Sequence, residues 1–493
     1  GVMTATTFEG SGASMTGVAM TITPLAYNPD VNDGIVDPST GIGITFDHRI
    51  LAGSGNVTLS IATNAGAAGT TVENFGVGSS VTIQGRKAII TPTSELDPGE
   101  TYHLSYPSGA FTNTGGDVSY VGTAYTFGTK SFTYSMFTWG GNDYGVQGLN
   151  TDGDAHRKSS PTQIPGTTWN KTTKGSRGEG WASAQRSDGT LWGWGRNEFG
   201  QVGNNNTSIY SSPIQIPGTT WATVVKGQWN QLATKTDGTL WSWGYNFLGL
   251  GVGDRVKRSS PTQIPGTDWA ITDGKVSTSN YHSAVIKTDG TLYTWGYNNH
   301  GQLAQNNLTQ RSSPVQIPGT TWRTVSVGEL ATHATKTDGT LWSWGYSGKG
   351  GGGRNTSTSV SSPVQIPGTT WSEGHMLVYE TALHVKTDGT LWTWGFNRYG
   401  ALGTNQAHDA KISSPVQVPG TTWSTTNYHV SGNQYRVNVI KTDGTMWTWG
   451  LNSYGSLGLN QDSGSYSSPV QIPGTTWHRI GTNALGAHAI KRA

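Results

Sequence analysis

The chain has 493 residues, enough for two or more domains, with 12% charged residues, 71 glycines and a formal net charge of +2. The small net charge argues against a strongly basic surface for DNA or RNA, so we expect no nucleic-acid partner. Cysteine is absent, which excludes disulfide and thiolate chemistry. No apolar run approaches the ~18 residues of a membrane span, so we expect no membrane insertion either.

Residues 1–22 are small and polar, and we expect a linker or the end of an upstream segment. Segment 23–128 contains no tryptophan and alternates short apolar runs with Gly, Pro, Asn and Asp turns. It therefore predicts an immunoglobulin-like β-sandwich of about a hundred residues. Its expected strands are Ile42–Phe46, Val57–Ile61, Val81–Ile83, Ala88–Thr91, Tyr102–Tyr106 and Ala124–Phe127.

The remaining segment, 131–493, repeats one pattern seven times. The copy from Lys235 to Trp269 reads K-T-D-G-T-L-W-S-W-G-Y-N and, after a polar stretch, S-S-P-T-Q-I-P-G-T-D-W. A period near fifty residues is typical of propellers and solenoids. The alternation in T-L-W-S-W and the Asp-Gly turn predict antiparallel strands, so each copy is expected to form one small sheet.

The two ends of the repeat region complement each other. The first copy begins late, at Phe132, and the last copy stops early, at Ala493. Joined, the two fragments make one complete blade. We therefore predict an all-β fold in which a seven-bladed β-propeller with a shared closing blade follows the immunoglobulin-like sandwich.

The combination D-G-T-L-W-x-W-G-x-N-x-x-G-x-L-G at Asp388–Gly403, which recurs with methionine for leucine at Asp443–Gly458, resembles the regulator of chromosome condensation repeat. The resemblance implies a seven-bladed propeller and a binding platform more than an activity. Members of that family include a nucleotide exchange factor for a small GTPase and a secreted β-lactamase inhibitory protein. The uniform copies, without a long insertion to form a wedge, disfavour the exchange role.

The segment from about Thr23 to Gly128 resembles the bacterial immunoglobulin-like domain first associated with surface-layer proteins, with Leu96-Asp-Pro-Gly-Glu-Thr-Tyr102 and Tyr125-Thr-Phe127 among the matching residues. Such domains usually act as spacers. The resemblance therefore implies a location outside the cytoplasm.

Tryptophans recur at three positions of the repeat, and we expect these to form the contacts between blades. Trp181 and Trp229 stand outside the pattern and are candidates for exposed ligand contacts. A basic residue also precedes each Asp-Gly hairpin or its equivalent: Arg186, Lys235, Lys287, Lys336, Lys386, Lys441 and Lys491. A ring of these cations would attract anionic polysaccharide, but an Asp follows the first six, and we favour a solvated, self-compensated rim.

Enzyme signatures are not found, and we expect no catalytic residue and no cofactor. The serines of Ser-Ser-Pro recur too regularly to be nucleophiles and are expected to cap turns. Metal binding stays open: Asp30, Asp33 and Asp37, or Asp152 and Asp154, would suit calcium, but they lack the spacing of an EF-hand loop, and ordinary polar turns are the favoured interpretation.

Binding is expected in the segments that vary between copies, because a rigid ring would hold them while leaving their sequence free. One set follows W-G-x-N-x-x-G, and the other lies between the tail tryptophan and the next Asp-Gly hairpin. The predicted binding residues are Trp181, Trp229, Tyr210, Arg255, Arg258, Arg311, Arg354, His408, Tyr428, Tyr435 and Tyr466.

Together these features predict a non-enzymatic extracellular structural or adhesive protein. We favour a phage virion fibre or decoration protein that binds a cell-surface glycan or protein receptor, or other virion or envelope proteins. The alternatives are a bacterial cell-surface or surface-layer-associated adhesin and a secreted protein-binding inhibitor.

Overall fold

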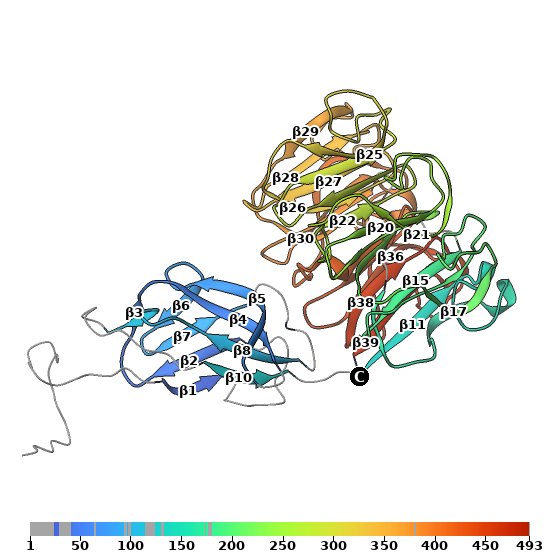
Figure 1. The fold of residues 1–493 in the computed structure, drawn as a ribbon. Coiled ribbons are helices and arrows are strands. Elements are labelled where there is room, and N and C mark those ends of the chain that lie inside the picture. The colour runs from blue at the N-terminus through green and yellow to red at the C-terminus, as the bar shows by residue number, and fades with distance from the viewer. Residues whose placement is uncertain are drawn as a thin grey trace, which may run out of the picture. The chain divides into compact units, whose positions relative to one another are not determined.

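The computed structural model describes residues 24–28, 41–63, 66–92, 96, 100–113, 124–129, 133–172, 174–175, 180–378 and 381–492. The chain divides into two compact units, Gly1–Phe132 and Thr133–Ala493 (Figure 1). The expected linker at residues 1–22 lies outside the described residues. Within the described ranges, no helix has the length and apolarity needed to cross a membrane.

The first unit packs two four-stranded sheets around one apolar core. One sheet has the order β1-β2-β7-β6, with β1 Pro24–Asn28, β2 Ile42–Phe46, β7 Lys87–Ile90 and β6 Val81–Gln84. The other has the order β10-β8-β4-β5, with β10 Tyr125–Gly128, β8 Thr101–Ser105, β4 Asn56–Ala62 and β5 Ala68–Gly76. A short pair joins β3 Leu51–Ala52 to β9 Phe111–Thr112. Strand β5 escaped prediction because most of it is exposed and lacks apolar alternation.

The described residues of the second unit form seven sheets, one for each copy of the repeat. In chain order, three sheets contain β13 Trp169–Thr172, β15 Trp181–Arg186, β16 Leu191–Gly195 and β17 Tyr210–Ile216; β14 Lys174–Gly175, β18 Trp221–Lys226, β19 Asn230–Lys235, β20 Leu240–Gly244 and β21 Arg258–Ile264; and β22 Val276–Thr278, β23 His282–Ile286, β24 Leu292–Gly296 and β25 Arg311–Ile317. Strand β14 pairs parallel with β18, whereas the other pairs are antiparallel.

The next three sheets contain β26 Trp322–Val327, β27 Ala331–Lys336, β28 Leu341–Gly345 and β29 Val360–Ile366; β30 Trp371–Val378, β31 Thr381–Lys386, β32 Leu391–Phe396 and β33 Lys411–Val418; and β34 Val430–Asn433, β35 Arg436–Ile440, β36 Met446–Leu451 and β37 Ser465–Ile472. Short 3-10 turns occupy Asp143–Gly145, Asp154–His156, Arg398–Gly400, Asn427–His429 and Ser453–Gly455.

The remaining sheet joins the two ends of the unit, as the sequence predicted. Its order is β12-β11-β39-β38, with β12 Lys158–Gln163, β11 Tyr134–Gly140, β39 Gly486–Arg492 and β38 Trp477–Thr482. Strands β11 and β39 pair in continuous antiparallel register from Tyr134 opposite Arg492 to Gly140 opposite Gly486, and Figure 1 shows them side by side. The ring is thus closed by strands from opposite ends of the unit.

Buried tryptophans join neighbouring sheets through hydrogen bonds. The indole Nε1 of each Trp-Gly tryptophan donates to a backbone carbonyl in the loop of the preceding sheet, over 2.7 to 3.2 Å. The bond from Trp139 to Ser456 extends this pattern across the closure. The seven donors are Trp139, Trp194, Trp243, Trp295, Trp344, Trp394 and Trp449.

The outer edges of the sheets are joined by a second set of bonds. A residue with positive φ, usually Asn, donates its backbone N–H to the carbonyl of the first serine of Ser-Ser-Pro in the next sheet, over 2.7 to 2.9 Å. Asn205 with Ser259 is typical, and Asn460 with Ser159 closes the ring. The expectation that these serines cap turns is therefore wrong, because they lie in or beside the outer strands and join neighbouring blades.

The charged side chains of the Asp-Gly hairpins form contacts within their own blades. Asp237 accepts hydrogen bonds from the N–H and the hydroxyl of Thr239, whose oxygen accepts from Trp241 Nε1 over 2.8 Å. The Thr239 bonds lower the pKa of Asp237. The preceding Lys235 lies 4.9 Å from the ring centre of Trp221 and 4.4 Å from that of Trp241.

All seven basic residues of this set are half-buried and stack on two aromatic rings in the same way, with cation-to-ring distances of 4.0 to 5.5 Å. The expected solvated rim is thus wrong for the cations, because cation–π contacts hold them against the sheets.

Several histidines are buried in the propeller unit. His282 Nε2 lies 2.8 Å from Thr332 Oγ1, His333 Nε2 lies 2.9 Å from the Gly351 carbonyl, and His488 Nε2 lies 3.0 Å from the Val146 carbonyl. Burial lowers the pKa of each of these three to about 3. Each is therefore neutral in the folded protein at neutral pH.

Deleting residues 134–140 removes β11 and leaves β12 and β39 without their shared partner. We expect the cooperative unfolding transition of the propeller unit to disappear, since open repeats cannot bury their terminal faces. Differential scanning calorimetry measures this, and an unchanged transition would refute closure by β11.

At six of the seven indole bonds, a glycine with positive φ lies next to the tryptophan ring. At the seventh, next to Trp344, the residue is Ala304. A Cβ added to Gly403 would lie 2.7 Å from Trp449 Nε1. We expect Gly403→Ala to lower the unfolding free energy by about 2 to 4 kcal/mol and Ala304→Gly to raise it by about 1 kcal/mol. Gly464 also has positive φ but open space around it, so Gly464→Ala isolates the backbone cost, expected at about 1 kcal/mol. Urea denaturation compares the three variants, and equal losses for Gly403→Ala and Gly464→Ala would contradict the contact.

Stability should depend on pH through the buried histidines. Their folded pKa values lie near 3 and unfolded histidine titrates near 6.5, so unfolding takes up protons below pH 6.5. We expect full stability above pH 6.5 and a loss approaching about 1 kcal/mol per histidine for each pH unit below about 6. Denaturant titrations at pH 7.5 and 5.5 test this, and His333→Gln should reduce the difference. Equal stability at both pH values would contradict it.

Candidate functional site

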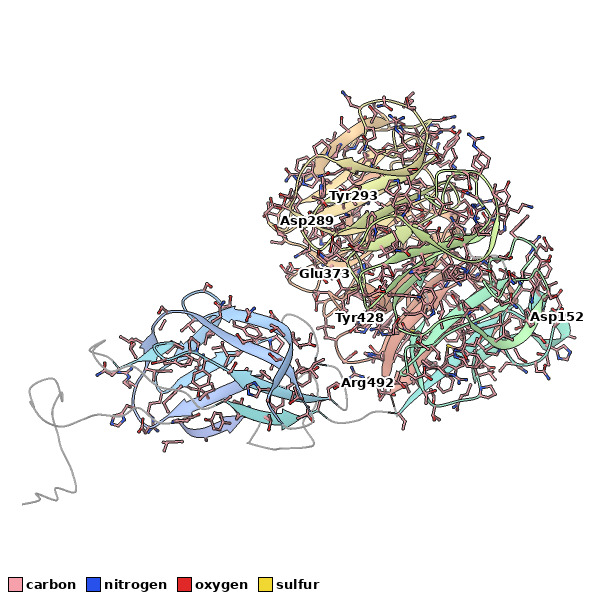
Figure 2. All side chains as sticks on the ribbon, in the orientation of Figure 1. Asp152, Asp289, Tyr293, Glu373, Tyr428 and Arg492 are labelled. Carbon is pink, nitrogen blue, oxygen red and sulfur yellow. The ribbon has the colours of Figure 1, made fainter. Side chains whose placement is uncertain are left out.

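The propeller unit has two different faces. The hairpin face carries the Asp-Gly turns between the second and third strands of the six sheets other than the closing sheet. The loop face carries the turns between the first and second strands and the longer loops between the third and fourth strands, which are 141–157, 196–209, 245–257, 297–310, 346–359, 397–410 and 452–464. Figure 2 shows Asp289, in a hairpin, and Asp152, in a long loop, on different sides of this unit. The loop face therefore collects the long variable loops.

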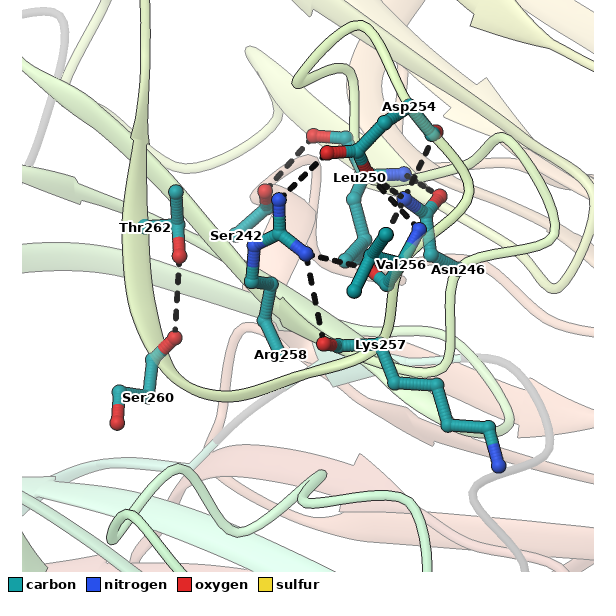
Figure 3. Close-up of polar contacts among 9 residues, drawn as sticks. All are labelled: Ser242, Asn246, Leu250, Asp254, Val256, Lys257, Arg258, Ser260 and Thr262. Carbon is teal, nitrogen blue, oxygen red and sulfur yellow. Dashed lines mark hydrogen bonds and ion pairs between the residues drawn. The ribbon is translucent and has the colours of Figure 1, made fainter.

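A buried polar side chain holds each long loop from within. In the loop 245–257, Asn246 donates to the Asp254 and Val256 carbonyls and accepts from the Leu250 N–H (Figure 3). The equivalent residues Asn142, Asn197, Asn298, Asn397, Asn452 and Ser347 each accept an N–H five residues further on. Because these side chains are buried, they fix the loops before any ligand arrives.

The tip of the same loop is held by an ion pair. Arg258 Nη2 lies 2.6 Å from Asp254 Oδ2, and Arg258 Nη1 donates to the Val256 carbonyl (Figure 3). The Val256 N–H bond, the Arg258 bond and the Arg258 charge lower the pKa of Asp254. Arg258 is therefore occupied in shaping the loop, whereas Arg255 is exposed.

Two clusters of aromatic side chains lie next to each other on the loop face. In each, a residue from the first turn of one blade meets the residue after Trp-Gly of the same blade and a loop residue of the preceding blade. Ring centres within the clusters lie 4.9 to 6.2 Å apart. We call the six residues the aromatic arc: Phe199, Trp229 and Tyr245 in one cluster, and Phe247, Tyr281 and Tyr297 in the next.

Amide side chains join and border the two clusters. Gln228 precedes Trp229 in one turn, and Asn280 precedes Tyr281 in the next. Asn280 Nδ2 donates to Gln228 Oε1 and so joins the two turns. Asn299 Nδ2 donates to the Tyr297 hydroxyl over 2.6 Å. Gln228 is buried and Asn280 is half-buried, so their bond joins the two clusters from below, and the exposed Asn299 borders the second cluster.

Exposed side chains surround the arc. Phe247 is 41% exposed, and the nearby loops carry the exposed apolar residues Ile209, Val256 and Leu308. Lys257 Nζ lies 4.8 Å from the Phe199 ring centre. Exposed apolar groups gathered on one face indicate a contact surface.

The structure places the predicted residues unequally. Trp229 belongs to the arc, and Arg255 lies in the loop 245–257 that carries Phe247. Tyr210, Arg258 and Arg311 begin the fourth strands of the three blades that form the arc. Trp181 is a correction, because it is fully buried and donates from Nε1 to the Gln228 carbonyl over 2.7 Å.

The other predicted residues lie apart from the arc. Arg354 donates to the Thr358 carbonyl within its own loop, Tyr466 donates to Gln461 Oε1, and His408 and Tyr435 both contact Tyr399. Tyr428 comes from the other set of variable segments and stays a prediction. It precedes β34 at the hairpin ends of the strands, apart from the arc.

Sequence reasoning missed Phe199, Tyr245, Phe247, Tyr281 and Tyr297. Most of them occupy the variable positions of W-G-x-N-x-x-G, so aromatic residues at those positions in neighbouring copies were the available signal.

A cavity of about 50 Å³ lies among the inner strands of the blades, with Tyr428 at one end. There Arg479 pairs with Asp273 over 2.8 Å and lies 3.8 Å from the Tyr428 ring centre. This volume has room for a few water molecules. The cavity is therefore a weaker candidate for a ligand site than the loop face.

A metal centre receives no support from the described residues, where no group of three His, Cys, Asp or Glu could hold an ion. Asp152 accepts the Gly145 N–H over 2.9 Å, as in an ordinary polar turn. Asp30, Asp33 and Asp37 lie outside the described residues.

Comparison with known families matches the regulator of chromosome condensation (RCC1) repeat to residues 188–229, 289–334, 388–426 and 443–487, and a second description of the same repeat to 275–302. The bacterial Ig-like domain matches residues 18–134.

Among curated relatives, the ultraviolet-B receptor UVR8 of Arabidopsis thaliana is 27% identical over 190 residues, which is 37% of this chain and 42% of the receptor. The human E3 ubiquitin-protein ligase HERC2 is 26% identical over 174 residues, or 34% of this chain and 4% of the ligase. The chain thus spans less than half of each relative.

Among solved structures, yeast RCC1 (Prp20) bound to Kap60 superposes with a TM-score of 0.64 at 16% identity, covering 73% of this chain and 89% of Prp20. This similarity shows the propeller fold. The chain therefore contains RCC1 repeats that build a β-propeller, together with a bacterial Ig-like domain.

Proposed function

We propose that this protein is a non-enzymatic adhesive or structural protein whose propeller unit binds its partner through the loop face. The aromatic arc is the observation that carries the proposal. It places six aromatic side chains from three neighbouring blades on the face that also holds the variable loops. Aromatic groups on rigid supports supply large contact area at a low entropic cost.

The polar groups around the arc support binding rather than catalysis. The carboxylate of Asp254 pairs with Arg258, and that of Glu198 pairs with Arg196 over 2.8 Å. Both carboxylates are engaged by arginines, which leaves them poorly placed to exchange a proton with a substrate. The arc therefore offers stacking, amides and cations to a bound molecule.

Protein binding by this fold has precedent in the solved relatives, since yeast RCC1 (Prp20) was solved bound to Kap60. The bacterial Ig-like domain supports a spacer role in a bacterial or phage setting. On these grounds we propose an extracellular location, first as a phage virion fibre or decoration protein. A bacterial cell-surface or surface-layer-associated adhesin is the second candidate, and a secreted protein-binding inhibitor is the third.

Localisation separates the three candidates. Immunogold electron microscopy of the source culture, with antibody against the propeller unit, is expected to label viral particles. Label on cell envelopes would replace the virion assignment by the adhesin. Label in the culture fluid alone would favour the inhibitor and contradict both adhesive assignments.

Binding by the loop face is tested with the full chain and bacterial cells from the same culture. We expect Phe247→Ser with Lys257→Ser to weaken cell binding about tenfold, because it removes a stacking surface and a charge from the arc. The control combines Tyr454→Ser with Lys411→Ser, since Tyr454 is 42% exposed against 41% for Phe247, and Lys411 is an exposed residue at the start of β33, outside the arc. Flow cytometry with labelled protein measures binding, and equal binding by the two double variants would contradict the proposal.

A further inference from the structure

We infer that the aromatic arc and the cations beside it bind an acidic polysaccharide, with sugar rings lying over the aromatic side chains and sugar carboxylates against Arg255, Lys257 and Arg311. This inference rests on the proposed function, because it assigns a ligand class to the same loop face.

The charges around the arc favour an anionic ligand. Its two neighbouring carboxylates, Asp254 and Glu198, are already paired with arginines. Arg255 and Lys257 are exposed and Arg311 is half-buried, and none of the three forms an ion pair with a described carboxylate. Three uncompensated cations on one arc create a local positive field despite the low net charge of the chain.

The seven repeated cations of the hairpin face are less accessible. There each basic residue of the repeat is half-buried against two aromatic rings, as Lys336 is at 4.9 Å from Trp322 and 4.3 Å from Trp342. Cations held in this way would lose their stacking contacts on turning toward a ligand. Lys257 also lies near two rings, at 4.8 Å from Phe199 and 5.8 Å from Tyr245, but it is exposed rather than half-buried, so a ligand can reach it without displacing it.

The aromatic groups provide surfaces of the size of single sugar rings. Phe247 is 41% exposed, and the other five residues are half-buried within rigid clusters. The half-buried Asn280 lies between the clusters, and the exposed Asn299 borders the second. Apolar C–H faces of a sugar pack on aromatic rings, while its hydroxyl groups bond amide side chains. A polysaccharide presents the same two kinds of group along its length, because each sugar has an apolar C–H face and polar hydroxyl groups.

The same alternation argues against a protein partner. A protein interface concentrates its energy in a fully desolvated apolar centre surrounded by a polar rim. On the arc, the half-buried amide of Asn280 lies between one cluster and the next, and the exposed Lys257 lies over Phe199. The surface is therefore divided into separate platforms, which suits a repeating polymer.

The test uses the full chain and immobilised polygalacturonate, alginate and hyaluronan, with neutral dextran and polyglutamate as controls. We expect at least one acidic polysaccharide to bind, and 0.5 M salt to weaken the binding at least about tenfold by screening. Dextran lacks the charge and polyglutamate lacks the sugar rings, so both should bind at least about tenfold more weakly. Equal binding of polyglutamate, equal binding of dextran, or no binding of the three acidic polysaccharides would each overturn the inference.

Variants assign the binding to the arc. Arg255→Ser with Lys257→Ser should weaken binding of the acidic polysaccharide about tenfold, and Phe247→Ser about three- to tenfold, whereas Lys411→Ser with Tyr454→Ser should stay within about twofold. The exposed positions of these residues leave the core intact, and thermal unfolding checks this for each variant. A loss in the control pair equal to that in the arc variants would overturn the assignment.

One further measurement separates this inference from the proposed function. Cells are treated with periodate to destroy surface polysaccharide, and binding of the unaltered chain and of Phe247→Ser with Lys257→Ser is compared. Binding that survives treatment yet still depends on the arc would overturn the polysaccharide ligand and keep loop-face binding. Binding that never depends on the arc would overturn the proposed function.

Discussion

The hydrogen bond from each Trp-Gly indole to a carbonyl of the preceding blade is the contact on which the propeller unit depends. One sheet of four short strands cannot bury its own faces, so each blade relies on its neighbours. A buried indole N–H also needs an acceptor, and only the correct spacing between two sheets supplies one. The bond thus sets both the distance and the register between blades, and Trp139 with Ser456 carries it across the point where the chain ends meet.

The acceptor of this bond lies in the long loop of the loop face, so the packing of the blades also positions the surface. The loop 245–257 is held at one end by the indole contact of Trp295 to Gly249 and from within by Asn246. Sequence changes at the outward positions leave these contacts untouched. The hairpin face has no such freedom, because its Lys, Thr, Asp and Trp side chains all bond or stack on one another. The two ends of the strands therefore differ in how freely their outward side chains can vary.

The fold was predictable because its signals are local and repeated. The alternation in T-L-W-S-W and the Asp-Gly turn specify strands and hairpins without reference to distant residues, and the complementary ends of the repeat imply closure. The site was less predictable because it depends on which blades become neighbours. Phe199 gains its role only when it meets Trp229 and Tyr245 of the next blade.

Trp181 shows why the sequence alone could not separate a buried tryptophan from a surface one. It pairs with Gly195, as Asn230 pairs with Gly244, so its counterpart in the next blade is Asn230 and not Trp229. Adjacent residues at a strand start point in different directions, and an offset of one residue separates a buried tryptophan from a surface one. The two unpatterned tryptophans looked equivalent in the sequence because this register is fixed only by strand pairing.

The shared closing sheet also has a mechanical consequence. A tensile load applied through the Ig-like unit enters the propeller at Tyr134, the first residue of β11. That strand is bonded on one side to β12 and on the other to β39, through seven residue pairs with the latter. The force therefore meets an inner strand of a sheet rather than a free edge, and pulling it out requires breaking both ladders. The strand that carries the covalent attachment is therefore anchored on both sides, as the proposed adhesive role would require.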